Sequence, residues 1–90
     1  MVIKTVSIQV SGLVQGFGFR YYTRKKEIEC NVNGFVQNKG DGSVYIEASG
    51  ESTDIDTFTD WCKQGPTWAK VADTQISILP NHEWNGFEIR

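Results

Sequence analysis

The chain has 90 residues, enough for one domain with a single core, and its composition is that of an ordinary globular protein. Its net charge of −2 argues against a surface for nucleic acid or an anionic membrane. No apolar run is long enough to span a bilayer, and the N-terminus lacks a signal-peptide pattern. We therefore expect one domain over residues 1–90, cytoplasmic and monomeric.

The chain begins with a predicted strand, a glycine-rich loop and a helix. Apolar and polar residues alternate over residues 3–11, as in a half-buried strand. Good helix formers then predict a helix over residues 19–30, and Asn31 is suited to end it in the left-handed conformation.

The apolar stripe of this first helix is thin. Phe19, Tyr22 and Cys30 lie near one face by helical spacing, and Thr23 and Glu27 share that face. We expect this helix to pack weakly.

A β-hairpin is predicted next. Residues 32–38 alternate in polarity, and so do Val44, Ile46 and Ala48. Between them, the glycines and aspartate of residues 39–42 indicate a tight turn. Gly50 is expected to end the second strand of the hairpin.

A second helix and two strands complete the prediction. Thr53 is the expected N-cap, and the helix stops at residues 65–66, a Gly-Pro pair. Its apolar stripe is formed by Ile55, Phe58, Trp61 and Cys62. A last short strand is expected at residues 87–89.

The strand over residues 70–79 carries a phase change. Ile76 and Ile78 are predicted to face inward, and Val71 is out of phase with them. This shift favours a β-bulge near Asp73.

Two cysteines, Cys30 and Cys62, have no second cysteine or histidine at the spacing of a metal site. We interpret both as small buried hydrophobic residues. Because each lies near the end of its own helix and the helices run antiparallel, the two should lie at opposite ends of the domain, beyond disulfide range.

The order β-α-β-β-α-β, with a short fifth strand, predicts an α+β, ferredoxin-like sandwich, an antiparallel sheet with both helices on one face. Right-handed crossovers put the first and third strands at the sheet centre, with the first and second strands running in the same direction. The glycine-rich loop and Asn38 should therefore meet at one end of the sheet.

The glycine-rich loop has the features of an anion site. Glycines 12, 16 and 18 let the backbone approach a ligand closely, and the first amides of a helix have no internal acceptors. Arg20 adds a permanently charged fork suited to phosphate oxygens.

Two spaced motifs resemble the acylphosphatase family. The first is Gly12-Leu13-Val14-Gln15-Gly16-Phe17-Gly18-Phe19-Arg20, and the second is Gly34-Phe35-Val36-Gln37-Asn38 followed by Gly42-Ser43-Val44. The similarity continues through Gly50, Trp61, Gly65-Pro66 and the final Phe87-Glu88-Ile89-Arg90, so it covers nearly the whole chain.

The resemblance implies a hydrolase of acyl phosphates that needs no metal or other cofactor. It assigns phosphoryl binding to Arg20 and to backbone amides, and positioning of the attacking water to Asn38. The amides are those of Gln15, Gly16, Phe17, Gly18, Phe19 and Arg20. The implied partners are a small acyl phosphate and inorganic phosphate or another oxyanion, with no nucleic acid and no membrane.

Four positions depart from the family pattern. Phe17 stands where valine or histidine is usual, and Gln37 stands where Lys or Arg is common. Glu27 and Cys30 replace an alanine and a branched aliphatic residue, which thins the core under the first helix. Phe17 and Gln37 bear on the chemistry, and Glu27 and Cys30 bear on stability.

Two other functions remain open from the sequence. Residues 15–22 resemble the aromatic RNP1 motif of RNA-binding domains of similar element order, but RNP1 belongs on the third strand. A non-catalytic domain that binds a phosphate ligand is the second alternative. His82 is expected to be an exposed loop residue without a catalytic role, and Trp68 and Trp84 are expected to serve packing.

Overall fold

Seven elements follow one another in the predicted order in a computed structural model that describes residues 2–16 and 18–90. They are β1 (Ile3–Leu13), α1 (Phe19–Cys30), β2 (Asn33–Asn38), β3 (Val44–Glu51), α2 (Ser52–Gln64), β4 (Lys70–Leu79) and β5 (Phe87–Ile89). β1 and β3 extend beyond their predicted ends, and Gly50 lies inside β3. Neither described helix has the length and apolar character needed to cross a bilayer.

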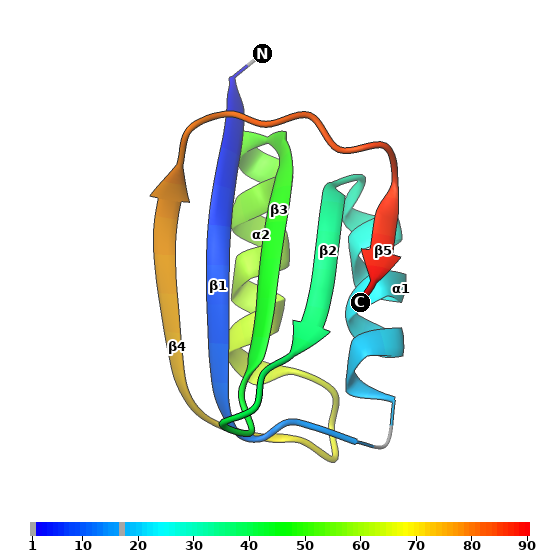
Figure 1. The fold of residues 1–90 in the computed structure, drawn as a ribbon. Helices are drawn as coiled ribbons and strands as arrows, with labels where there is room; N and C mark the ends of the chain where they lie inside the picture. Colours follow the sequence, from blue (N-terminus) through cyan, green and yellow to red (C-terminus); the bar gives the residue numbers. More distant parts are fainter. Residues whose placement is uncertain (1, 17) are drawn as a thin grey trace.

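The five strands form one sheet in the order β4-β1-β3-β2-β5. β3 runs antiparallel to both β1 and β2, whereas β5 joins the free edge of β2 in parallel. Both helices cover one face of this sheet, with α2 behind β1 and β3 and α1 behind β2 and β5 (Figure 1). The ferredoxin-like α+β prediction is confirmed, with β1 and β3 at the centre.

The core lies between the sheet and the two helices. Alternate residues of the central strands point into it because side chains of a strand alternate between faces. The fully buried members include Val6, Ile8, Val10, Val36, Val44, Ile46, Ile55 and Phe58.

The outer strand β4 departs from prediction. Ile76 and Ile78 pair with buried residues of β1, yet they are 40% and 75% exposed. They lie on the helix side of the sheet, but β4 is its edge and α2 is centred over β1 and β3 (Figure 1). The two isoleucines thus face the helix side, as predicted, but no helix covers them and they remain exposed. The predicted bulge is confirmed, because the β1–β4 register shifts between Asp73 and Val71.

Gly34 allows β2 and β3 to approach closely. It has a φ of +155°, and a Cβ built there would lie 1.8 Å from the carbonyl oxygen of Glu47 on β3. Any larger residue would push the two strands apart. The glycine of the second motif is thus required by the sheet itself.

Helix α1 matches its predicted bounds. Asn31 closes it in the left-handed conformation (φ 60°), and the Val32 amide donates back to the Glu27 carbonyl, as in a Schellman cap. Tyr22, predicted on the buried stripe, is instead 42% exposed. The buried row runs along Phe19, Thr23, Glu27 and Cys30, and Tyr22 lies beside it.

Glu27 is fully buried in the core beneath α1. Its exposed fraction is 0%, and neither carboxylate oxygen has a hydrogen-bond partner among the described residues. This desolvation raises the pKa of Glu27 from an ordinary 4.5 to about 10. The side chain is therefore a neutral acid at pH 7, and it weakens the core as its departure from the family pattern suggested.

Both cysteines are buried free thiols, Cys30 at the end of α1 and Cys62 in α2. Burial raises the pKa of the Cys62 thiol well above its ordinary value. Their interpretation as small core residues is confirmed.

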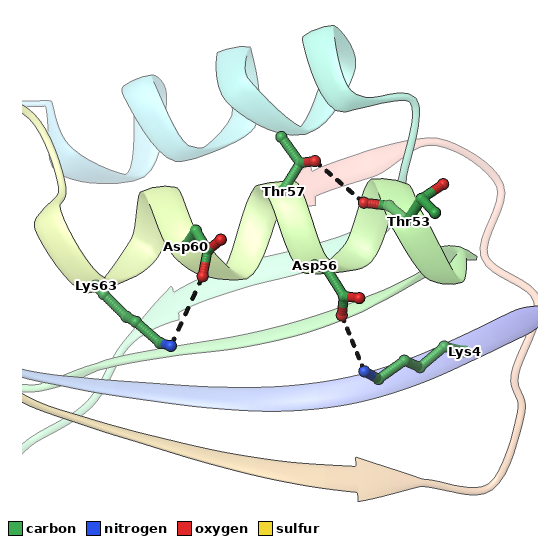
Figure 2. Close-up of polar contacts among 6 residues, drawn as sticks. All are labelled: Lys4, Thr53, Asp56, Thr57, Asp60 and Lys63. Carbon is green, nitrogen blue, oxygen red and sulfur yellow. Dashed lines mark hydrogen bonds and ion pairs between the residues drawn. The ribbon is translucent and has the colours of Figure 1, made fainter.

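Helix α2 begins two residues earlier than predicted. Its N-cap position is Glu51, without a side-chain cap, and Thr53 lies inside the helix. The Thr53 N-cap prediction is wrong because β3 runs directly into α2, and the Ser52 amide already donates to the Val2 carbonyl. The Thr53 carbonyl accepts a bond of 3.1 Å from the Thr57 hydroxyl (Figure 2).

An ion pair links α2 to β1. Lys4 Nζ lies 3.0 Å from Asp56 Oδ1, whereas the Lys63–Asp60 pair stays within the helix at 3.7 Å (Figure 2). Both pairs are partly exposed, so each contributes less than about 1 kcal/mol. The buried stripe of α2, with Ile55 and Phe58, holds the helix in place.

We predict that Glu27 makes stability depend on pH. The native carboxyl binds its proton more tightly than the unfolded chain does, so the free energy of unfolding falls as pH rises from 5 towards 9. The expected slope is about 1 kcal/mol per pH unit in urea unfolding. Glu27→Gln should flatten it, and Glu29→Gln, on the exposed side of α1, should not. A slope that persists in Glu27→Gln would contradict this origin.

Candidate active site

One end of the sheet gathers the segments that carry both motifs. β1 leaves the sheet there through the glycine-rich loop to the start of α1, and β2 ends at the same side (Figure 1). This meeting follows from topology, since β1 and β2 both run antiparallel to β3. Asn38 and the loop are thereby brought to one edge, as predicted.

A cleft of about 340 Å³ opens at this edge. It is bordered by the loop, the first turn of α1 and the ends of β2 and β5. The lining residues are Gly16, Gly18, Phe19, Arg20, Tyr21, Asn38 and Ile89. Arg20 and Asn38, which lie far apart in the sequence, thus share one cleft.

The start of α1 presents amide groups to this cleft. Gly18 is the N-cap in the left-handed conformation (φ 80°), and it carries no side chain that could cap the helix. The Phe19 amide donates to the Gly16 carbonyl at 3.2 Å, so it is already engaged in a turn. Among the described residues, no carbonyl is paired with the amides of Gly16, Gly18 or Arg20. Phe17 lies outside the described residues.

The Arg20 guanidinium is held from one side by the end of the sheet. Its Nη1 donates to the Arg90 carbonyl at 2.9 Å, and the Arg90 amide donates to the Val36 carbonyl of β2 at 2.8 Å. Within the described part of the chain, no carboxylate side chain lies within ion-pair distance of Arg20. The remaining donors of the guanidinium are therefore available to an anion.

The side chain of Gln15 joins the loop to the hairpin that follows Asn38. Its Nε2 donates to the Lys39 carbonyl at 2.7 Å and to the Ser43 carbonyl at 2.8 Å. These two bonds set the separation of the glycine-rich loop from the end of β2. Asn38, adjacent to Lys39, is held at the rim of the cleft as a result.

The hairpin turn is itself well ordered by hydrogen bonds. Asp41 Oδ1 accepts from the Ser43 hydroxyl at 2.6 Å and from the Ser43 amide at 3.0 Å. These bonds from Ser43 hold the pKa of Asp41 below its usual value. The predicted tight turn is confirmed, and it provides a rigid support for Asn38.

Three other residues singled out in the sequence lie away from this cleft or beside it. His82 is exposed, and its amide donates to the Thr5 hydroxyl at the opposite end of β1 from the loop. Trp84 packs edge-on against Phe35 on the open face of the sheet, as expected for a packing residue. Trp68 packs against the Phe19 ring and lines a neighbouring cleft.

Sequence reasoning missed the side chain of Gln15 and the contribution of β5. Only the amide of Gln15 was considered, although a carboxamide with two donors between Val14 and Gly16 is suited to bridge two carbonyls. The role of β5 depends on its parallel pairing with β2, which brings Ile89 and Arg90 to the cleft. A three-residue strand gives no such signal by itself.

The donor set of this cleft consists of amides, a guanidinium and a carboxamide. Across residues 2–16 and 18–90, no three His, Cys, Asp or Glu side chains gather as a group that could hold a metal ion. Backbone amides and a guanidinium are groups suited to a tetrahedral oxyanion. The fold and the cleft together define a ferredoxin-like domain whose glycine-rich loop, between β1 and α1, borders a cleft with these donors.

Comparison with known proteins agrees with this description. A family model described as acylphosphatase matches residues 6–89, and the chain belongs to the acylphosphatase family. An acylphosphatase of Mannheimia succiniciproducens is 55% identical over 62 residues, which is 69% of each chain. An acylphosphatase of Vibrio vulnificus is 38% identical over 89 residues, covering 99% of each chain.

Solved structures of the family share the fold closely. An acylphosphatase from Coxiella burnetii superposes with a TM-score of 0.93 at 33% identity, covering 98% of this chain and 93% of that one. The acylphosphatase from Bacillus subtilis gives a TM-score of 0.92 at 31% identity and covers 99% of both chains. The resemblance stated from the two motifs is confirmed.

We predict that Gln15→Leu loosens the hairpin, because the variant lacks both donors to the Lys39 and Ser43 carbonyls. The free energy of unfolding should fall by about 1–2 kcal/mol in urea titrations. Amide hydrogen exchange at Lys39 and Gly42 should accelerate, since those turn bonds lose their support. Gln37→Leu is the matched control on β2. Unchanged exchange at both amides in Gln15→Leu would show that the bridge is dispensable.

Proposed function

We propose that the protein hydrolyses the carboxyl–phosphate anhydride of small acyl phosphates to a carboxylate and inorganic phosphate, through Arg20, Asn38 and the loop amides and without a metal. The proposal is carried by one observation: Arg20 and Asn38, from α1 and β2, line the same cleft as the glycine-rich loop. Family membership supports the same reaction. The earlier expectation of a cytoplasmic monomer is kept as part of this proposal.

The phosphoryl group is bound by charge and oriented donors. In phosphoryl transfer through a loose transition state, negative charge spreads over the equatorial oxygens. Arg20 and the free amides of the loop supply donors that are fixed before substrate arrives, so little reorganisation is needed as the charge develops. The bond from Arg20 to the Arg90 carbonyl holds the guanidinium in place for this task.

Asn38 orients the attacking water. Its carboxamide offers one acceptor and two donors, and the Gln15 bridge keeps the hairpin beside it close to the loop. The water oxygen forms a bond to phosphorus while the bond to the bridging oxygen breaks, and the carboxylate leaves with that electron pair. A phosphate oxygen takes the proton from the water, so the step requires no histidine, and His82 lies outside this machinery.

We predict that Arg20→Ala lowers kcat/KM by at least about a hundredfold, since a preorganised charged donor is lost. Arg20→Lys should recover only part of the rate because a point charge cannot replace a planar fork. Release of phosphate from benzoyl phosphate, with and without a chelator, measures both. Lys25→Ala, on the exposed side of the same helix, is the control. Arg20→Ala with more than a tenth of wild-type activity would refute the assignment.

Asn38→Ala is expected to separate turnover from binding. Loss of the water-positioning group should lower kcat by about a hundredfold or more. Inorganic phosphate should still compete with substrate at nearly its wild-type inhibition constant, because Arg20 and the loop remain. Asn33→Ala, at the other end of β2, is the matched control. Near-normal turnover in Asn38→Ala would exclude the proposed role.

A further inference from the structure

A second cleft lies on the other side of the glycine-rich loop. Its volume is about 560 Å³, against about 340 Å³ for the cleft of Arg20 and Asn38, which we call the phosphoryl cleft. It lies between the end of β1, the first turn of α1 and the segment before β4. It is lined by Leu13, Gln15, Tyr22 and Trp68. Three of these four side chains are apolar or aromatic.

The cleft keeps large apolar groups exposed at the surface. Leu13 is 69% exposed and Tyr22 is 42% exposed. Exposed apolar groups gathered in a concave site favour binding of an apolar ligand. Neither Glu27 nor the exposed isoleucines of β4 contribute to this cleft.

The two clefts meet at a pair of adjacent tyrosines. Tyr21 lines the phosphoryl cleft and Tyr22 lines the apolar one, and their rings meet edge-on with centroids 5.5 Å apart. The Phe19 ring lies 6.2 Å from that of Trp68, but it is buried, so it supports Trp68 from within the core. A ligand that reaches from one cleft to the other would contact the exposed rings of Tyr21 and Tyr22.

The rim itself presents little bulk at its glycines. Apart from its own chain neighbours, Gly16 has no atom within 4 Å of a Cβ built on it, whereas a Cβ on Gly18 would make ordinary contacts with the side chains of Tyr21 and Tyr22, from 3.8 Å. Beside Gly16 the space is therefore open, and Phe17 lies outside the described residues. The Gln15 carboxamide is directed away from this path, since it is bonded to the hairpin.

The geometry of the reaction indicates in which direction the acyl group lies. In-line displacement places the leaving oxygen opposite the attacking water. When Asn38 holds the water at the β2 side of the cleft, the acyl oxygen points away from β2, towards the loop and the first turn of α1. The acyl group then extends over the rim in the direction of Leu13 and Tyr22.

We propose that the cleft of Leu13, Tyr22 and Trp68 binds the acyl group of the substrate, and that aromatic and larger aliphatic acyl phosphates are the preferred class. This inference rests on the proposed function of the phosphoryl cleft. It deepens that function, because the substrate is recognised at two ends by different chemistry. Amides and Arg20 bind the anion, and apolar side chains bind the acyl group.

The test compares acetyl phosphate with benzoyl phosphate in the full chain. Wild type should show a kcat/KM for benzoyl phosphate about tenfold or more above that for acetyl phosphate, corrected for their uncatalysed hydrolysis rates. Leu13→Ser and Tyr22→Ser should each lower this ratio by about threefold to tenfold, mainly through KM for benzoyl phosphate. Two variants are used so that poor folding of one does not end the test.

Ile78→Ser is the matched control, because Ile78 is also an exposed apolar residue but lies on β4 and lines neither cleft. It should leave the substrate ratio at the wild-type value. Benzoate should inhibit wild type more strongly than acetate does, and Leu13→Ser should reduce that difference.

Each outcome has a distinct meaning. A fall in the ratio in the two cleft variants but not in Ile78→Ser supports the inference. An unchanged ratio, with both substrates hydrolysed in an Arg20-dependent manner, overturns it and leaves the proposed function intact. If neither substrate releases phosphate above background, the proposed function fails, and the acyl site fails with it.

Discussion

The antiparallel pairing of β3 with both β1 and β2 is the constraint on which the site depends. It forces β1 and β2 to run in the same direction, so the loop after one and the asparagine ending the other meet at one edge. The two bonds from Gln15 to the hairpin then fix their separation. Arg20 and Asn38 are thereby brought together by the pairing of the strands and by the side-chain bonds of Gln15 to the hairpin backbone.

The short strand β5 adds a second support to the same edge. Its parallel pairing with β2 carries the chain to the Arg90 carbonyl, which accepts from Arg20, while the Arg90 guanidinium lies 4.0 Å over the Phe35 ring on the open face. A three-residue strand contributes little stability. Through this pairing it brings the main-chain oxygen of Arg90 to the Arg20 guanidinium at the start of α1.

The most unfavourable feature of the fold lies away from this chemistry. Glu27 occupies a core position without a hydrogen-bond partner, where a neutral apolar residue would pack better. The cost falls on stability, because the carboxyl stays protonated and faces neither cleft. Within α1, the first turn lines the cleft of Arg20 and Asn38, and the middle of the helix carries the buried carboxyl of Glu27.

The sequence alone determined the element order, the fold class, both motifs and the family, because these follow from periodicity, turn residues and motif spacing. The turn at residues 39–42, the Asn31 cap and the bulge near Asp73 were also local enough to be predicted. Tertiary structure decided what depends on neighbours distant in the chain. Ile76 and Ile78 are exposed because α2 does not extend over this part of β4. The start of α2 depends on the bond from the Ser52 amide to the Val2 carbonyl. The Gln15 bridge forms only when the hairpin is folded against the loop. Local patterns define which face a side chain takes, but only packing determines what covers that face.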